Sequence, residues 1–71
     1  MERDELIADL MRRDDIEVMV AHELGCTEDM GLAAYQMELV RRGILCRPPV
    51  AVAVGVIADM ILAARLARQA G

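Results

Sequence analysis

Three side chains in the sequence could bind a metal ion, or act together as a nucleophile and its base: His22, Cys26 and Cys46. A structural zinc site needs four Cys or His ligands around the ion, usually arranged in paired motifs. These three residues cannot supply such a set. We therefore expect no metal, and interpret them as a solvent-facing histidine and two buried thiols. The sequence has no Gly-rich phosphate loop and no pair of acids expected in one pocket. A small bundle also offers little concave volume, so we predict a non-enzymatic protein without a cofactor.

The composition indicates more apolar surface than one small core can cover. The chain has 71 residues, of which 56% are hydrophobic, with one Tyr and no Trp or Phe. A domain of this size buries only about 60% of its unfolded surface. The remaining apolar side chains need a partner or a second copy. We expect residues 1–71 to form a single all-α domain, a small bundle of three to four helices completed by dimerisation.

The charges are divided unevenly along the chain. Residues 1–30 carry ten acids and three arginines, a net charge of −7, whereas residues 31–71 carry two acids and five arginines, a net charge of +3. The overall charge of −4 argues against a general nucleic-acid binder, which neutralises phosphates with basic residues. The asymmetry could pair two copies antiparallel or present an acidic face to a basic partner. A solvated acidic surface is the simpler alternative.

The sequence favours a cytoplasmic protein. Two cysteines do not make a disulfide framework, and Met1–Glu5 is too polar to open a signal peptide. The most apolar run, residues 48–64, is shorter than the roughly 20 residues that span a bilayer and contains Asp59. We therefore expect no membrane span.

The first two helices are predicted from apolar spacing and capping residues. A helix from Glu2 to about Arg12 places four apolar residues on one face: Leu6, Ile7, Leu10 and Met11. Asp14 followed by Glu17 is a capping-box arrangement, which predicts a second helix over residues 15–24. Gly25 can close that helix in the left-handed conformation. One long helix kinked at Asp14 is the alternative.

A third helix is predicted from Thr27 to Arg42. Thr27 is a good N-cap residue, and the acids Glu28 and Asp29 suit the positive end of the helix dipole. Arg41 and Arg42 suit the negative end, and Gly43 ends the helix.

The last segment, from Pro48 to about Gln69, is ambiguous between strand and helix. Its valines alternate as in a strand at positions 50, 52, 54 and 56, but alanines rather than polar residues separate them. Its length, the prolines at its start and the arginines near its end favour one long helix. A helix that is apolar on all sides is buried on all sides. We therefore expect it to pack against another copy, with a dimer interface at Val52, Gly55, Val56 and Met60.

Residues 21–45 resemble the helix-turn-helix and winged-helix regulators. The resemblance rests on Ala21–Gly25, Thr27, Leu32, Leu39 and Arg42–Leu45. It implies DNA binding, with four residues nearest the DNA backbone: Thr27, Gln36, Arg41 and Arg42. The turn is one residue longer than in that family, Gly31 stands where an aliphatic residue is usual, and no two-stranded wing follows.

The predicted third helix carries two apolar stripes where a DNA-reading helix would show polar and basic side chains. We name Leu32, Tyr35 and Leu39 the inner stripe, and Met30, Ala33, Met37 and Val40 the outer stripe. One stripe must serve the domain's own core, which leaves the other for a partner. Methionine is common on surfaces that bind other helices. The predicted partner-binding residues are Met30, Ala33, Tyr35, Met37, Val40 and Arg41. Burial of both stripes inside the bundle or its dimer is the alternative.

These patterns predict a small protein-binding regulator or inhibitor, of the kind encoded by bacteria and their phages. One helix of this chain would dock in a groove of another protein and block that groove. The acidic half of this chain would select a partner whose groove has a basic rim. A wingless helix-turn-helix transcriptional regulator is the second hypothesis, although the charge makes nucleic-acid binding unlikely. A purely structural assembly subunit is the third.

Overall fold

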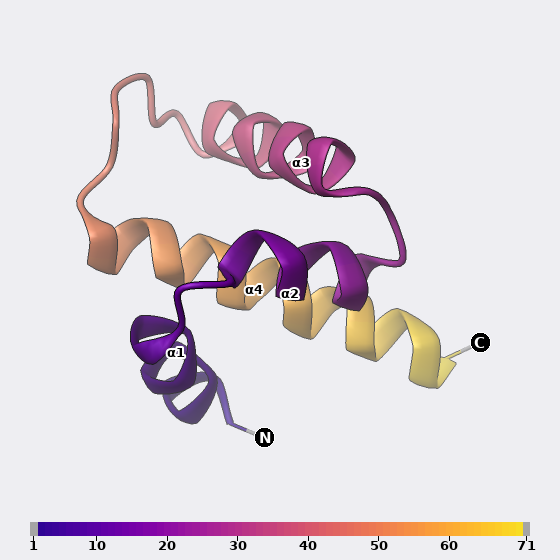
Figure 1. The fold of residues 1–71 in the computed structure, drawn as a ribbon. Coiled ribbons are helices and arrows are strands. Elements are labelled where there is room, and N and C mark those ends of the chain that lie inside the picture. Colours follow the sequence, from indigo (N-terminus) through magenta and orange to yellow (C-terminus); the bar gives the residue numbers. More distant parts are fainter. Residues whose placement is uncertain (1, 71) are drawn as a thin grey trace.

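The computed structural model describes residues 2–70, and these form four helices (Figure 1). Helix α1 spans Arg3–Arg12, α2 spans Ile16–Leu24, α3 spans Glu28–Arg41 and α4 spans Val50–Ala70. Helix α4 contacts all three others, and α2 also contacts α3. No strand occurs within residues 2–70, so the all-α prediction is confirmed. Completion of the bundle by dimerisation stays a prediction.

The hydrophobic core lies between α1, α2 and α4. Its buried members are Leu6, Leu10, Val20, Val54, Ala58 and Ile61. The predicted apolar face of α1 thus packs inward, except that Met11 is 54% exposed. Helix α3 contributes none of these residues. The core is therefore a three-helix core, against which α3 is laid as a fourth element.

The break between α1 and α2 differs in detail from the prediction. Residues 13–15 are not helical, which excludes one long helix kinked at Asp14. The capping box is wrong, because the N-cap residue of α2 is Asp15 and its side chain makes no cap hydrogen bond. The Asp15 carboxylate instead accepts a hydrogen bond from Arg13, at 3.4 Å. At the other end Gly25, with φ of 68°, closes α2 as predicted.

The ends of α3 follow the predicted signals. The Thr27 hydroxyl accepts a hydrogen bond from the Met30 backbone N–H at 3.2 Å. Glu28 and Asp29 lie in the first turn. The last helical residue is Arg41, one residue earlier than predicted, and Gly43 has φ of 78°. Capping therefore fixes where α3 begins and ends.

Helix α4 begins directly after the two prolines, which excludes the strand alternative. It is long and apolar enough to cross a membrane by length and composition. The apolar run counted in the sequence ends at Ala64, whereas the helix continues to Ala70. One helix of this kind is weak evidence for a membrane span, so the absence of a span stays a prediction. Its central Asp59 accepts hydrogen bonds from Arg3 at 2.7 Å and from Arg42 at 3.2 Å. These contacts tie α1 and the end of α3 to α4 within a small, compact, globular chain.

Candidate protein-binding site

Helix α3 approaches the rest of the bundle most closely at Gly31. Gly31 is its only buried residue. A Cβ atom added there would lie 3.3 Å from Val20 Cγ1 and 3.8 Å from the Ala21 backbone nitrogen. The missing side chain thus lets α3 lie against α2 at this point.

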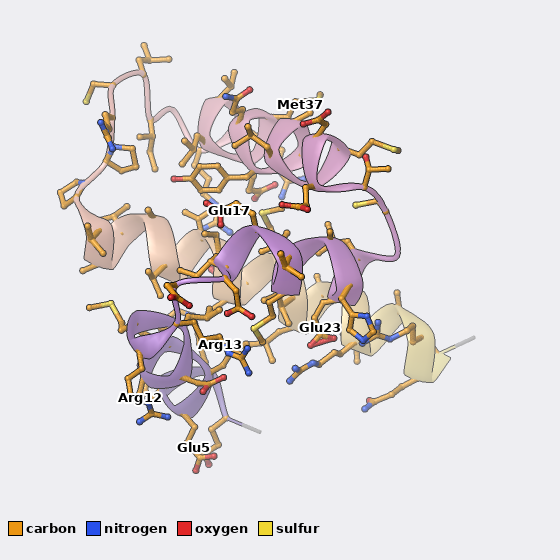
Figure 2. All side chains as sticks on the ribbon, in the orientation of Figure 1. Glu5, Arg12, Arg13, Glu17, Glu23 and Met37 are labelled. Carbon is orange, nitrogen blue, oxygen red and sulfur yellow. The ribbon has the colours of Figure 1, made fainter. Side chains whose placement is uncertain are left out.

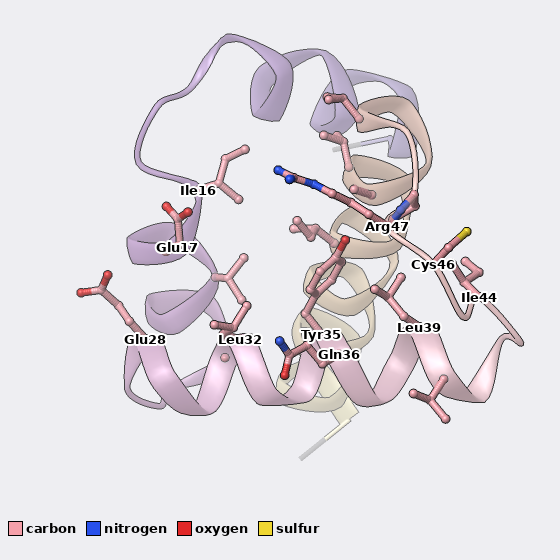
Figure 3. Close-up of a pocket in the computed structure, with 18 of the residues that line it drawn as sticks. Ile16, Glu17, Glu28, Leu32, Tyr35, Gln36, Leu39, Ile44, Cys46 and Arg47 are labelled. Carbon is pink, nitrogen blue, oxygen red and sulfur yellow. The ribbon is translucent and has the colours of Figure 1, made fainter.

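Beyond this contact a groove of about 700 Å³ opens along the inner side of α3 (Figure 3). We call it the α3 groove; its walls are α3, the start of α2, the first half of α4 and residues 44–48 of the connection. The apolar side chains that line it are Ile16, Val20, Leu32, Tyr35, Leu39, Val40, Ile44, Leu45, Pro48, Val50, Ala53, Val54 and Ile57. The prediction that one stripe of α3 fills the domain's own core is therefore wrong. The inner stripe faces this groove, and Leu32 is 50% exposed.

Polar side chains lie on opposite walls of the α3 groove. Glu17 and Glu28 lie together on the α2 side, and Arg47 extends from the connection toward them (Figure 3). The Tyr35 ring points from α3 into the space between these walls. Within residues 2–70, neither acid nor Arg47 takes part in an ion pair. A protein that enters the groove would therefore meet an apolar floor between charged rims.

The outer stripe lies on the other side of α3 and is open to solvent. Met37 is 74% exposed and points away from α2 and α4 (Figure 2). Met30 is 61% exposed and Val40 67%. A shallow hollow of about 290 Å³ is lined by Ala33, Gln36, Met37 and Val40. The outer stripe is therefore a second apolar surface, which meets the α3 groove at Gln36 and Val40.

The six residues predicted to bind a partner do not form one site. Ala33 and Met37 line the outer hollow, Tyr35 lines the α3 groove and Val40 lines both, whereas Met30 is exposed outside the two linings. Arg41 is exposed and donates to Glu38 at 2.9 Å.

The helical projection of the sequence predicted both stripes. The lining of the groove also includes Leu45 and Arg47 from the connection, which that projection does not cover. In the sequence, Leu45 stands out only as an apolar residue in a connecting segment. In the structure its side chain is 87% exposed.

The residues predicted at a dimer interface of α4 do not form one exposed patch. Gly55 and Val56 are buried inside the single chain, Met60 is half-buried and Val52 is 44% exposed. A Cβ atom on Gly55 would lie 3.1 Å from Arg3 Nη2. The close neighbour of this glycine is thus an arginine of the same chain. The dimer itself stays a prediction.

The residues first considered for chemistry lie apart from the α3 groove or at its edge. His22 is exposed and Cys26 half-buried, but Cys46 is exposed, so its prediction as a buried thiol is wrong. Cys46 lies on the connection, where no helix covers it. Within residues 2–70, no three potential metal ligands lie close enough to hold an ion.

Ion pairs within the chain neutralise most arginines of the second half. Arg65 and Arg68 donate to the Glu23 carboxylate, Arg65 Nε at 2.9 Å and Arg68 at 3.0 Å. The hydrogen bond from Arg65, followed by that from Arg68, holds the pKa of Glu23 below its ordinary value. Arg41 and Arg42 likewise pair with Glu38. Four of the five arginines of the second half are thus paired within the chain, whereas several acids of the first half, among them Glu17 and Glu28, form no ion pair within residues 2–70.

This pairing predicts a pH-dependent stability. Because the folded-state pKa of Glu23 is lowered, its contribution is complete above the ordinary glutamate pKa of about 4.3 and is lost as pH falls through the folded-state value. We expect Glu23→Gln to lower the free energy of unfolding by about 1–2 kcal/mol at neutral pH. The difference should shrink under acid conditions. Urea titrations followed by circular dichroism across pH measure it, with Glu17→Gln as the control. An equal effect of the two substitutions would contradict the assignment.

No known protein family, curated protein or solved structure matches this sequence.

Proposed function

We propose that this chain is a small cytoplasmic, non-enzymatic regulator of the kind that bacteria and phages encode. It binds one amphipathic helix of another protein in the α3 groove. The bound helix is thereby withheld from its other contacts, which inhibits the protein that carries it. The observation that carries the proposal is the α3 groove itself, an open apolar channel with Tyr35 on its floor.

The length of α3 and the apolar lining of the groove suit one face of a helix, with the rest of that helix outside the groove. Helix α3 has 14 residues, which at about 1.5 Å per residue is about 21 Å, or roughly four turns. Helix-in-groove recognition places one apolar helical face in such a channel. The role of this chain thus differs from the sequence hypothesis, in which it supplied the docking helix. Here it supplies the groove.

Charge indicates which helices would bind. Glu17 and Glu28 on the rim have no ion-pair partner within residues 2–70, and most other free acids also belong to the first half of the chain. A helix with basic residues on the side that meets Glu17 and Glu28 would pair with this rim, and an acidic residue on its other side would pair with Arg47. Because such rim pairs are exposed to water, added salt should weaken binding.

DNA binding is less well supported. A recognition helix contacts base edges with residues of its N-terminal part. In α3 that part carries the exposed acids Glu28 and Asp29. Both carboxylates would face the phosphates of a duplex, and the arginines at the other end are paired with Glu38.

The test is capture of a binding protein by the purified chain and by variants of each surface. Leu32→Glu places a charge in the α3 groove at a side chain that is already 50% exposed, so folding should be preserved. We expect it to weaken binding at least tenfold, since desolvating one carboxylate costs more than 1.4 kcal/mol. Proteins retained from a host lysate are identified by mass spectrometry, and binding is measured again with purified components.

Leu66→Glu is the matched control, because Leu66 is 67% exposed and does not line the groove. Met37→Glu reports on the outer stripe. Binding that survives Leu32→Glu but disappears with Met37→Glu would place the partner on the outer stripe instead. Salt-dependent binding to duplex DNA, measured by fluorescence polarisation at low salt, would support the helix-turn-helix hypothesis.

A further inference from the structure

The outer stripe of α3 is apolar and exposed, and it borders the α3 groove only at Val40. We propose that a second copy of this chain covers it, with the two α3 helices packed antiparallel. This assigns a homodimer interface to α3 rather than to α4, and it leaves the rest of the groove of each copy open.

The spacing of the outer stripe matches itself when reversed. Its residues stand at 30, 33, 37 and 40, with steps of three, four and three in either direction. In an antiparallel pair Met30 therefore lies opposite Val40 of the second copy, and Ala33 lies opposite Met37 of the second copy. Such self-complementarity is what a two-fold symmetric interface requires.

The sizes of the opposed side chains also fit. Met37 is 74% exposed, and both Met37 and the much smaller Ala33 line the shallow hollow. In the antiparallel arrangement each Met37 would lie over the small Ala33 side of the other copy's hollow. A parallel arrangement would oppose Ala33 to Ala33 and Met37 to Met37, so that small side chains face small ones and large face large.

Charges at the two ends of α3 favour the same direction. The first turn carries Glu28 and Asp29, which form no ion pair within residues 2–70. At the other end Arg41 pairs with Glu38 at 2.9 Å, but its side chain stays 78% exposed, and Arg41 and Arg42 together outnumber Glu38. Antiparallel packing brings the acidic end of one helix beside the basic end of the other, and also opposes the two helix dipoles. Parallel packing would bring the acids of both copies together.

The contact is small, which sets the expected affinity. One face of a helix of this length covers less than the roughly 800 Å² per partner of a standard interface. We therefore expect a reversible dimer with a dissociation constant in the micromolar range rather than an obligate one. The chain has its own core, so the monomer stays folded.

Sedimentation equilibrium of the full chain over a range of concentrations tests the interface. We expect a monomer–dimer equilibrium, and a dissociation constant at least tenfold higher for Met37→Glu. Met11→Glu is the matched control, because Met11 is a 54% exposed methionine on α1. A monomer at all concentrations would overturn the proposal, as would a dimer that Met37→Glu and Met11→Glu affect equally. Circular dichroism confirms that each variant is folded.

Disulfide trapping tests the direction. Cys26 and Cys46 are first replaced by alanine, and the variants Ala33→Cys and Met37→Cys are then oxidised separately and as a mixture. Antiparallel packing predicts that the cross-linked product between the two variants predominates in the mixture. Predominant cross-linking of each variant with itself would overturn the antiparallel arrangement.

Discussion

Leu10→Ala is expected to lower the free energy of unfolding by about 2–5 kcal/mol. Leu10 is fully buried in the core formed by α1, α2 and α4. Truncation removes its apolar contacts and leaves a cavity that neighbours fill only in part. A chain of 71 residues has a total stability of about 4–11 kcal/mol at roughly 0.05–0.15 kcal/mol per residue. The substitution should therefore remove a large share of that stability.

Urea unfolding followed by circular dichroism measures this effect. Leu66→Ala is the control, because Leu66 lies on α4 outside the core and is 67% exposed. Its effect should stay within about 0.5 kcal/mol. Equal midpoints for the two variants would mean that α1 does not pack on α4 as described.

Gly31→Leu is expected to push α3 away from α2 and to lower the free energy of unfolding by about 1–3 kcal/mol. Even a Cβ atom at this position would lie 3.3 Å from Val20 Cγ1, and a leucine adds further carbons beside the Ala21 backbone. Leucine favours helix over glycine by up to about 1 kcal/mol, which offsets part of the loss. Because this contact sets the distance between α3 and α2, the α3 groove should change shape as well.

Thermal unfolding at low protein concentration measures the stability change. Ala33→Leu adds a leucine to the exposed side of the same helix and serves as the control. It should leave the melting temperature of the monomer almost unchanged. If Gly31→Leu unfolds at the same temperature as Ala33→Leu, the close approach at Gly31 has no energetic role.

Local signals in the sequence predict the helices well. Thr27, Gly25 and Gly43 act through hydrogen bonds and backbone angles that depend on a few neighbouring residues. The capping box at Asp14 failed because α2 begins one residue later than that motif requires, with Asp15 as its N-cap residue. Periodicity also identified both stripes of α3, since a helical projection needs only the sequence.

The surroundings of those stripes could not be predicted in the same way. Whether the inner stripe is covered depends on how α3 lies relative to α2 and α4, and its one buried contact, Gly31 on Val20 of α2, joins residues from two different helices. The same holds for Gly55, where the nearest neighbour is Arg3, far away in sequence. Long-range contacts of this kind leave no local pattern. The α3 groove, which depends on three separated segments, therefore emerges only from the fold.

The division between a three-helix core and a helix laid against it has a consequence for cooperativity. Helix α3 buries only Gly31, so it can detach at a lower free energy than is needed to open α1, α2 and α4. Global unfolding and the release of α3 are thus separate events. A protein bound in the α3 groove would supply the apolar contacts that α3 lacks in the free chain. The local order of α3 would then rise with the concentration of that protein, so that occupancy and folding of this helix become one equilibrium.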